Sequence, residues 1–470
     1  MRYQLLGGLC LLLTTTLSFA NLPPVDANIK ENTVKQIGEL MKANYVYPDK
    51  GKEAAAFLIE KLQAGDFDNI TESKAFADAL TKAVQEVTKD KHLRLRPNRS
   101  GGQHHTEEDA IKERVDRQER FRQFNQGVAQ VRKLENNVGY LQLDGFAGFP
   151  GSKAAIDAAM ELLKTSDAII IDLRKNGGGD PFTVQYLCSY FFEEHLLLNS
   201  LYWREGGVTE EFWTLEKVDG TKLPDIPLYV LTSNYTFSGA EEFSYNMQTR
   251  KRATLVGETT GGGANPGGGF KINDHFGMFI ATGRAINPVT GISWEGTGVV
   301  PEVKVEADKA FDKATKLASE VANQVRTKAR QQYKQASVSL NHLLADTAKK
   351  VEEHNVDKLA PSFFEAIKPI AKALNLTEER VNELGYSYMI QKQLPLISVL
   401  LMKFNTHENP DSANAYDSLG DALLAANNPE KAKMSFAKGL LLADKNDVQL
   451  IEVLTKNLAK ATALIQKSDG

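Results

Sequence analysis

The chain has 470 residues, of which 42% are hydrophobic and 25% are charged, and its formal net charge is −4. This composition is typical of a globular protein with a buried core, and at roughly 150 residues per domain the length predicts about three domains. The mixed, slightly acidic charge argues against a nucleic-acid partner, because such a partner favours a basic face.

The first 20 residues have the pattern of a secretory signal peptide. Arg2 precedes an apolar run at 5–13, and the stretch Ser18-Phe19-Ala20 offers a small-x-small cleavage site. The apolar run is too short to span a bilayer, and no later segment is long and apolar enough to do so. We therefore expect cleavage after Ala20 and a periplasmic or secreted mature chain. An N-terminal membrane anchor is the alternative.

Cysteine and metal-ligand patterns are sparse. Cleavage of the signal would leave Cys188 as the single cysteine, and it lies in an apolar run where a buried thiol is expected. Neither HExxH nor paired CxxC spacing is present, so the sequence predicts no metal site and no cofactor.

The next segments alternate between helical and β-type patterns. Residues 21–100 predict a helical domain, because apolar side chains recur at helical spacing, as at Val34, Ile37 and Met41. Residues 101–136 predict a polar linker and a charged helix. In 137–306, short β-type runs alternate with helices and glycine-rich turns, which predicts an α/β core with its chemistry on the turns.

The remaining residues are helical in pattern. Residues 307–375 predict a helical connector, and 376–470 contain two similar stretches, VNELGYSYMI and YDSLGDALLA, in which Gly385 aligns with Gly420. The second stretch and its continuation have tetratricopeptide-like spacing. We expect these repeats, closed by a capping helix, to bind a peptide or protein partner or to support the core.

Ser238 is the first candidate for chemistry. It stands between an apolar, β-prone run at 226–232 and a helix-like segment at 240–247, where a serine can present its Oγ as a nucleophile. Serine is also a preferred helix N-cap, and Glu241 three residues later completes a capping-box pattern. These residues alone favour neither interpretation.

Three further stretches supply possible partners. Glycines 177–179 follow a buried strand and could present N–H groups to an oxyanion, although a simple turn is the commoner explanation. A serine nucleophile needs a base, and His92, His195 and His275 are the candidates, among which sequence position does not choose. Glu295 could orient a histidine, although an exposed turn glutamate is more common.

In this order, the stretches VGYLQL, DLRKNGGG, LTSNYTFSGAEEF, RATLVGETTGGG and EGTGVVPEV resemble the tail-specific, or C-terminal processing, serine peptidase family over about 137–305. The resemblance implies an α/β, Clp-protease/crotonase-like spiral core that hydrolyses a peptide or protein substrate through an acyl-serine. By position, Ser238 resembles the nucleophile. The N–H of Gly239 and the backbone of Gly177 or Gly178 resemble the oxyanion hole.

The family has two branches that differ in the base. One uses a lysine, and here the aligned position is Gly263. The other includes the tricorn core and interphotoreceptor retinoid-binding protein, and its histidine and glutamate segments resemble KDKHLRL and WEGTGVVPE. The resemblance therefore implies His92 as base and Glu295 as its orienting carboxylate. The linker leaves no room for a PDZ-like insertion. A non-catalytic ligand- or peptide-binding protein on the same fold is the alternative function.

Overall fold

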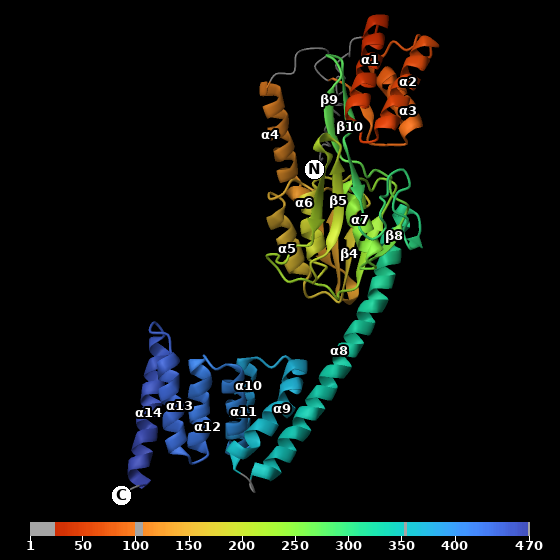
Figure 1. Ribbon diagram of the computed structural model, residues 1–470. Coiled ribbons are helices and arrows are strands. Elements are labelled where there is room, and N and C mark those ends of the chain that lie inside the picture. Colours follow the sequence, from red (N-terminus) through yellow and green to blue (C-terminus); the bar gives the residue numbers. More distant parts are fainter. Residues whose placement is uncertain (1–23, 99–106, 352–354, 469–470) are drawn as a thin grey trace, which may run out of the picture. The chain divides into compact units, whose positions relative to one another are not determined.

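The computed structural model describes residues 24–98, 107–351 and 355–468 (Figure 1). The predicted signal peptide at 1–20 lies outside this range. The backbone forms two compact units that divide between Gln324 and Val325. Among the described helices, none has the length and apolar character needed to cross a membrane.

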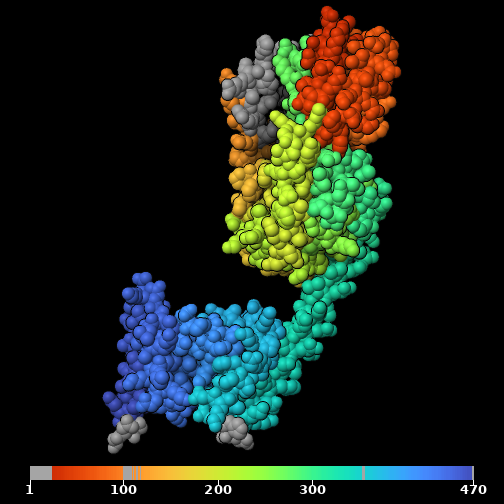
Figure 2. Space-filling model, in the orientation of Figure 1, coloured from red at the N-terminus to blue at the C-terminus, as the bar shows by residue number. Residues whose placement is uncertain are grey.

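The first unit begins with a small helical domain that shares its apolar core with a strand pair. Its elements are α1 (Ala27–Asn44), α2 (Pro48–Gln63), α3 (Ser73–Thr88) and β1 (Arg94–Pro97). The side chain of Asp26 caps α1 by accepting from the Ile29 N–H at 2.8 Å. β1 pairs with β10 (Phe276–Ala281), which pairs in turn with β9 (Gly267–Lys271). Buried side chains of these helices and strands form one cluster, and Figure 2 shows the red and orange helices lying against the green segment that contains β9 and β10.

A six-stranded sheet is the centre of this unit. Its order is β12-β8-β7-β4-β3-β2, in which β2 runs antiparallel to β3 and the other neighbours are parallel. The strands are β2 (Val128–Lys133), β3 (Val138–Leu143), β4 (Ala168–Asp172), β7 (Leu228–Thr232), β8 (Thr254–Gly257) and β12 (Val303–Lys304). Every residue of β4 and β7 is buried, as expected for central parallel strands.

Helices cover both faces of the sheet. One face packs against α5 (Lys153–Leu163), α6 (Pro181–Ser189) and α7 (Gly239–Thr249), and Cys188 is fully buried there as predicted. The other face packs against the first turns of α8 (Ala307–Val351) through Ala310, Ala314, Ala318 and Ala322. These small side chains let the helix backbone approach the sheet closely. A further antiparallel sheet contains β11 (Gly283–Ile286), β5 (Leu197–Trp203) and β6 (Val208–Trp213), and α4 (Glu107–Gln123) precedes β2.

The second unit is entirely helical within its described residues. Besides the end of α8 it contains α9 (Val356–Leu374), α10 (Glu378–Tyr386), α11 (Pro395–Glu408), α12 (Ala413–Ala425), α13 (Pro429–Leu442) and α14 (Val448–Ser468). A Cβ at Gly385 would lie 2.5 Å from Met402, and one at Gly420 would lie 2.3 Å from the Phe436 ring. The two aligned glycines therefore permit close helix packing. The prediction of an α/β core between an N-terminal helical domain and a C-terminal all-α region is confirmed.

Candidate active site

Ser238 lies between β7 and α7 in a backbone conformation that serine seldom adopts. Its φ is +53° and its ψ is −122°, so the chain turns sharply at the helix N-terminus. Such strain is found mainly where the surrounding structure holds a functional group in place. The Ser238 N–H donates to the Glu241 carboxylate at 2.9 Å. Ser238 thus combines a helix-capping interaction with a strained turn.

The glycine turn after β4 packs directly against Ser238. A Cβ at Gly178, whose φ is +102°, would lie 2.7 Å from Ser238 Cβ and 2.8 Å from the Gly239 nitrogen, so only glycine fits. β4 and β7 are parallel neighbours, and their following turns therefore meet at one sheet edge. The Gly178 N–H donates to Asn176 Oδ1 at 2.9 Å, which commits that group within the turn. Gly178 and Gly239 thus lie against Ser238, and Gly177 precedes Gly178 in the same turn, where it faces Tyr235.

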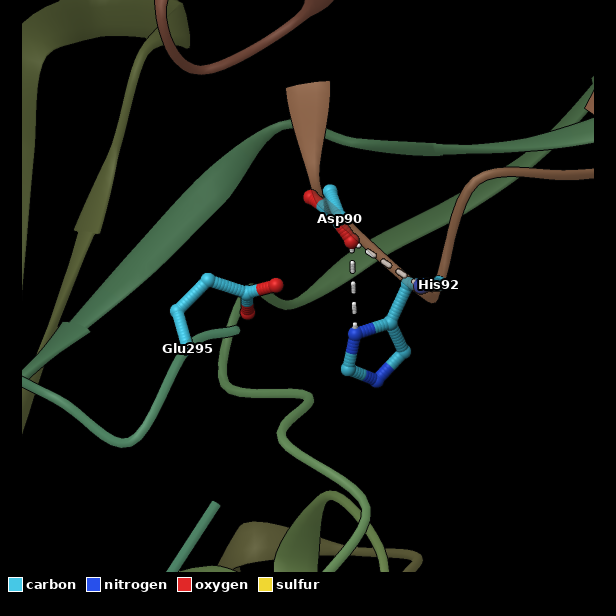
Figure 3. Close-up of side chains that lie close together, drawn as sticks. All are labelled: Asp90, His92 and Glu295. Atoms are coloured by element: carbon cyan, nitrogen blue, oxygen red, sulfur yellow. Dashed lines mark hydrogen bonds and ion pairs between the residues drawn. The ribbon is translucent and has the colours of Figure 1, made fainter. Parts of the chain in front are cut away.

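His92 lies with two carboxyl groups in a cluster in which Asp90 is buried and His92 and Glu295 are partly buried. One nitrogen or oxygen atom from each of Asp90, His92 and Glu295 lies within 4.8 Å of those from the other two (Figure 3). The His92 ring packs against Phe237 at 4.6 Å and Phe279 at 5.6 Å between ring centroids. Because Phe237 precedes Ser238, this packing brings the imidazole to the chain segment that carries the serine.

The other two candidate histidines have different surroundings. The His195 ring stacks on Trp213 at 5.0 Å, and its Nδ1 lies 2.8 Å from the Thr214 carbonyl oxygen. His275 lies in the turn before β10, where its N–H donates to Asn273. Of the three histidines that the sequence leaves open, only His92 joins Glu295 in the part of the chain that the structure describes.

Burial sets the electrostatics of the His92 group. Burial, together with the positive charge of Arg94, lowers the pKa of His92 to about 4. Burial and the nearby Asp90 charge raise the pKa of Glu295 to about 8, and burial also raises the pKa of Asp90. Two carboxyls this close do not both ionise readily, so the group favours a neutral histidine and a single negative charge on the carboxyl pair.

Two atoms of this group have no hydrogen-bond partner among the described residues. They are His92 Nδ1 and Glu295 Oε1, and both are buried. The other oxygen of Glu295 accepts from the N–H groups of Ala264 at 2.6 Å and Asn265 at 3.0 Å. Buried polar atoms are rarely left unpaired, so this group keeps a potential donor and a potential acceptor for a further partner.

The surroundings of Gly263 leave no room for a lysine side chain at this position. A Cβ on this residue would lie 2.1 Å from the Phe237 ring and 2.7 Å from His92 Cε1. Its carbonyl oxygen accepts from the Trp294 indole at 2.8 Å, which holds the backbone in position. The rings of Phe237 and His92 therefore fill the space that a side chain would need.

Glu241 joins the serine turn to this glycine segment. Its carboxylate accepts from the N–H groups of Ser238, Gly262 and Gly263 and from the Thr260 hydroxyl. We expect Glu241→Gln to lower the free energy of unfolding by about 2–3 kcal/mol, because its amide leaves at least one buried N–H without an acceptor. Urea unfolding tests this.

Glu242→Gln is the matched control for that variant. Glu242 is a buried neighbour on α7, and burial raises its pKa to about 7, so its neutral form is already accessible. An equal loss of stability in both variants would contradict the bridging role of Glu241.

Sequence reasoning missed three contributors to this site. Asp90 stands two residues before His92, Phe237 one residue before Ser238, and Glu241 was considered only as part of a helix cap. The DKH spacing was a usable signal for Asp90, because a carboxylate at this distance commonly accepts the N–H two residues on. The bridge from Glu241 to Thr260, Gly262 and Gly263 has no local signal, since these partners lie about twenty residues further along the chain.

Two family models match this part of the chain. Residues 137–305 match peptidase family S41, and residues 27–131 match the N-terminal domain of peptidase S41 in eukaryotic IRBP. The carboxyl-terminal-processing protease of Picosynechococcus sp. is 27% identical over 159 residues, which are 33% of this chain and 36% of that protein. The protein of the same name from Synechocystis sp. is 28% identical over 152 residues, or 32% and 34%. The chain thus spans about a third of the length of these relatives.

Solved structures give weaker similarity. The photosystem II D1 C-terminal processing protease is 23% identical with a TM-score of 0.31, and the match covers 36% of this chain and 43% of that one. The tricorn protease is 13% identical with a TM-score of 0.39, and the match covers 63% and 37% of the two chains.

Proposed function

This chain belongs to peptidase family S41 through residues 27–131 and 137–305, and we propose on that premise that it is a serine peptidase. It would hydrolyse peptides or proteins through an acyl-serine on Ser238. The observation that carries the proposal is the strained Ser238 turn, which packs against Gly178 and Gly239 and is followed by its own helix N-terminus. A serine that served only as a cap would not need this conformation.

The proposed mechanism assigns one task to each group. His92 takes the proton of Ser238 Oγ while that oxygen attacks the carbonyl carbon of the substrate. The Gly239 N–H, at the positive end of α7, and the Gly177 N–H stabilise the oxyanion, since the Gly178 N–H already donates to Asn176. His92 then returns the proton to the leaving amine, and water hydrolyses the acyl-serine. Glu295 orients His92 and stabilises its cation.

Labelling with a fluorophosphonate probe tests this proposal directly. We expect covalent modification that maps to Ser238 in the wild-type protein and is lost in Ser238→Ala, because only an activated serine reacts with the probe. Ser233→Ala is a matched control, since Ser233 lies in the same turn and its hydroxyl donates to the Arg174 carbonyl at 2.6 Å. Folded wild-type protein that resists the probe would favour the alternative, a ligand- or peptide-binding protein.

The pH dependence of hydrolysis follows from the buried histidine. Only neutral His92 accepts a proton, and its pKa is lowered to about 4, so kcat/KM should fall on acidification only near that pH. An ordinary histidine would give a fall near about 6.5. Arg94→Ala should move the fall to higher pH, because the Arg94 charge disfavours the imidazolium. If kcat/KM falls near pH 6.5, and the Arg94→Ala substitution does not move that fall, His92 is excluded as the base.

Two wider parts of the proposal concern the rest of the chain. A periplasmic or secreted location rests on the signal pattern at 1–20, and N-terminal sequencing of the exported protein would test it. The tetratricopeptide-like assignment of 376–470 rests on the glycine-dependent packing of α10 on α11 and of α12 on α13. We propose that these helices bind a peptide or protein partner.

A further inference from the structure

We propose that Asp90 is the charged carboxylate that positions His92, and that it shares a single proton with Glu295. This inference rests on the proposed peptidase function and adds a residue to its catalytic group. It also exchanges the expected roles, because Asp90 carries the negative charge and Glu295 carries the proton.

The contacts of Asp90 favour its ionised form. The side chain is fully buried, and its Oδ1 accepts the His92 N–H at 2.9 Å. Its Oδ2 accepts from the Tyr45 hydroxyl at 3.3 Å and from Asn265 Nδ2 at 3.1 Å. Three donors from separate segments thus stabilise a carboxylate whose Oδ1 lies 3.7 Å from His92 Nδ1. The short turn from Asp90 to His92 keeps this oxygen on the Nδ1 side of the ring.

The contacts of Glu295 leave one oxygen for a proton. Oε2 accepts two backbone N–H groups, whereas Oε1 is buried and has no partner among the described residues. The charges of the pair act on Tyr45 and Tyr47, which lie between α1 and α2, and the charge of Glu241 on α7 acts on Glu295; none of these three groups supplies a positive charge. Arg94, on β1, lowers the pKa of His92. A shared proton on Glu295 Oε1 removes the repulsion between the two carboxylates.

Replacing each carboxyl by its amide separates the two assignments. We expect Asp90→Asn to lower kcat about 100-fold with KM little changed, because the imidazolium loses its charged partner and Glu295 only partly replaces it. Glu295→Gln exchanges one neutral group for another and should cost less than about tenfold. The double variant should lose more than the product of the two single losses, since no carboxylate then remains.

Asp90→Asn is designed to preserve the local fold. Its side-chain oxygen can still accept the His92 N–H, and its amide can donate to Asn265 Oδ1, which has no partner in the described structure. Thermal unfolding of each variant checks the fold. A severe loss in Glu295→Gln with a loss under about twofold in Asp90→Asn would overturn the proposal.

A titration of the His92 ring by NMR gives a readout that does not depend on hydrolysis. The imidazole nitrogens should report a step near pH 8 in the wild-type protein, as the carboxyl pair loses its shared proton. Glu295→Gln should lack this step, and in Asp90→Asn it should move to lower pH, because burial still raises the pKa of Glu295 but the Asp90 charge no longer does. An unchanged midpoint in Asp90→Asn would overturn the proton sharing even in a protein that hydrolyses no peptide.

If Asp90→Asn does not fold, Asn265→Ala provides a second test of the proton sharing in the same NMR titration. It removes one donor to Asp90 Oδ2, so the step should move to higher pH, and an unchanged midpoint would count against the proposal.

A second, independent observation is a cleft of about 640 Å³ beside the glycine turn. Its lining includes Phe121, Phe124, Val128 and Ala129. Phe124 is 71% exposed. A Cβ at Gly145 would lie 3.8 Å from the Phe121 ring and 4.0 Å from the Gly178 carbonyl oxygen. Gly178 also contacts Ser238, so the glycine turn after β4 lies between the cleft and the proposed nucleophile.

We infer that this cleft receives an apolar side chain of the peptide substrate. A peptide advances about 3.3 Å per residue, so a side chain one or two residues from the scissile bond reaches it. Ala129→Trp should fill the cleft from an exposed position. It should lower kcat/KM at least tenfold for peptides with leucine or phenylalanine near the scissile bond, and less than twofold for alanine peptides.

The matched control is Ala158→Trp, an equally large change at an exposed position of α5. Equal losses on both kinds of peptide, or the same selective loss in the control, would overturn the assignment. Binding of the same peptides to Ser238→Ala, followed by fluorescence anisotropy, separates failure of the cleft from failure of the peptidase proposal. If Ala129→Trp weakens the binding of both kinds of peptide equally, the assignment of the cleft is wrong and the peptidase proposal is unaffected.

Discussion

Replacing His92 by phenylalanine should lower kcat/KM for peptide hydrolysis about 10³-fold, because the serine then has no group to take its proton. Phenylalanine keeps an aromatic ring between Phe237 and Phe279, so the loss of the base is separated from a loss of packing. The measurement is steady-state hydrolysis of a fluorogenic peptide, with thermal unfolding to confirm the fold.

His195→Ala and His275→Ala are the controls for this experiment. His195 stacks on Trp213 and His275 lies in a turn, so each variant should keep kcat/KM within about threefold of wild type. Activity that survives His92→Phe and disappears in either control would assign the base to another histidine.

Introducing a lysine at Gly263 should also abolish hydrolysis rather than create a Ser–Lys pair. The new Cβ would lie 2.1 Å from the Phe237 ring and 2.7 Å from His92 Cε1, so both rings must move. A displacement of about 1 Å at a catalytic group costs about 10²-fold in rate. We expect at least that loss in kcat, together with a fall in stability of about 1–3 kcal/mol from overpacking.

Gly269→Lys is the matched control for this change. Gly269 lies on β9 with no atom within 4 Å of its added Cβ, so kcat and the unfolding midpoint should hardly change. An active Gly263→Lys enzyme that no longer needs His92, tested as the double variant with His92→Phe, would show that lysine can serve as base on this fold.

Some of the site was accessible to sequence reasoning because it is local. A β-prone run, a small polar turn and a helix follow one another around Ser238, and the glycine triplet follows a continuously apolar strand. Parallel neighbouring strands bring such turns to one edge, so proximity of Gly178 and Ser238 follows once the sheet order is known. The oxyanion role of these glycines, and the triad of Ser238, His92 and Glu295, stay predictions.

Other features depended on contacts between distant segments. Three histidines were equivalent by position, and the pairing of β1 with β10 distinguishes them by holding His92 against the core. Asp90 was overlooked because an aspartate before a strand is ordinary, and its significance appears only where Glu295 approaches it.

The sequence by itself determined the α/β core, the helical segments on either side and the turn that carries the serine, because these follow from hydrophobic periodicity and local turn chemistry. Only the tertiary structure decided which titratable groups share one buried volume. Burial and the distances between charges control their protonation, and both arise when segments about 200 residues apart, such as those of Asp90 and Glu295, pack together.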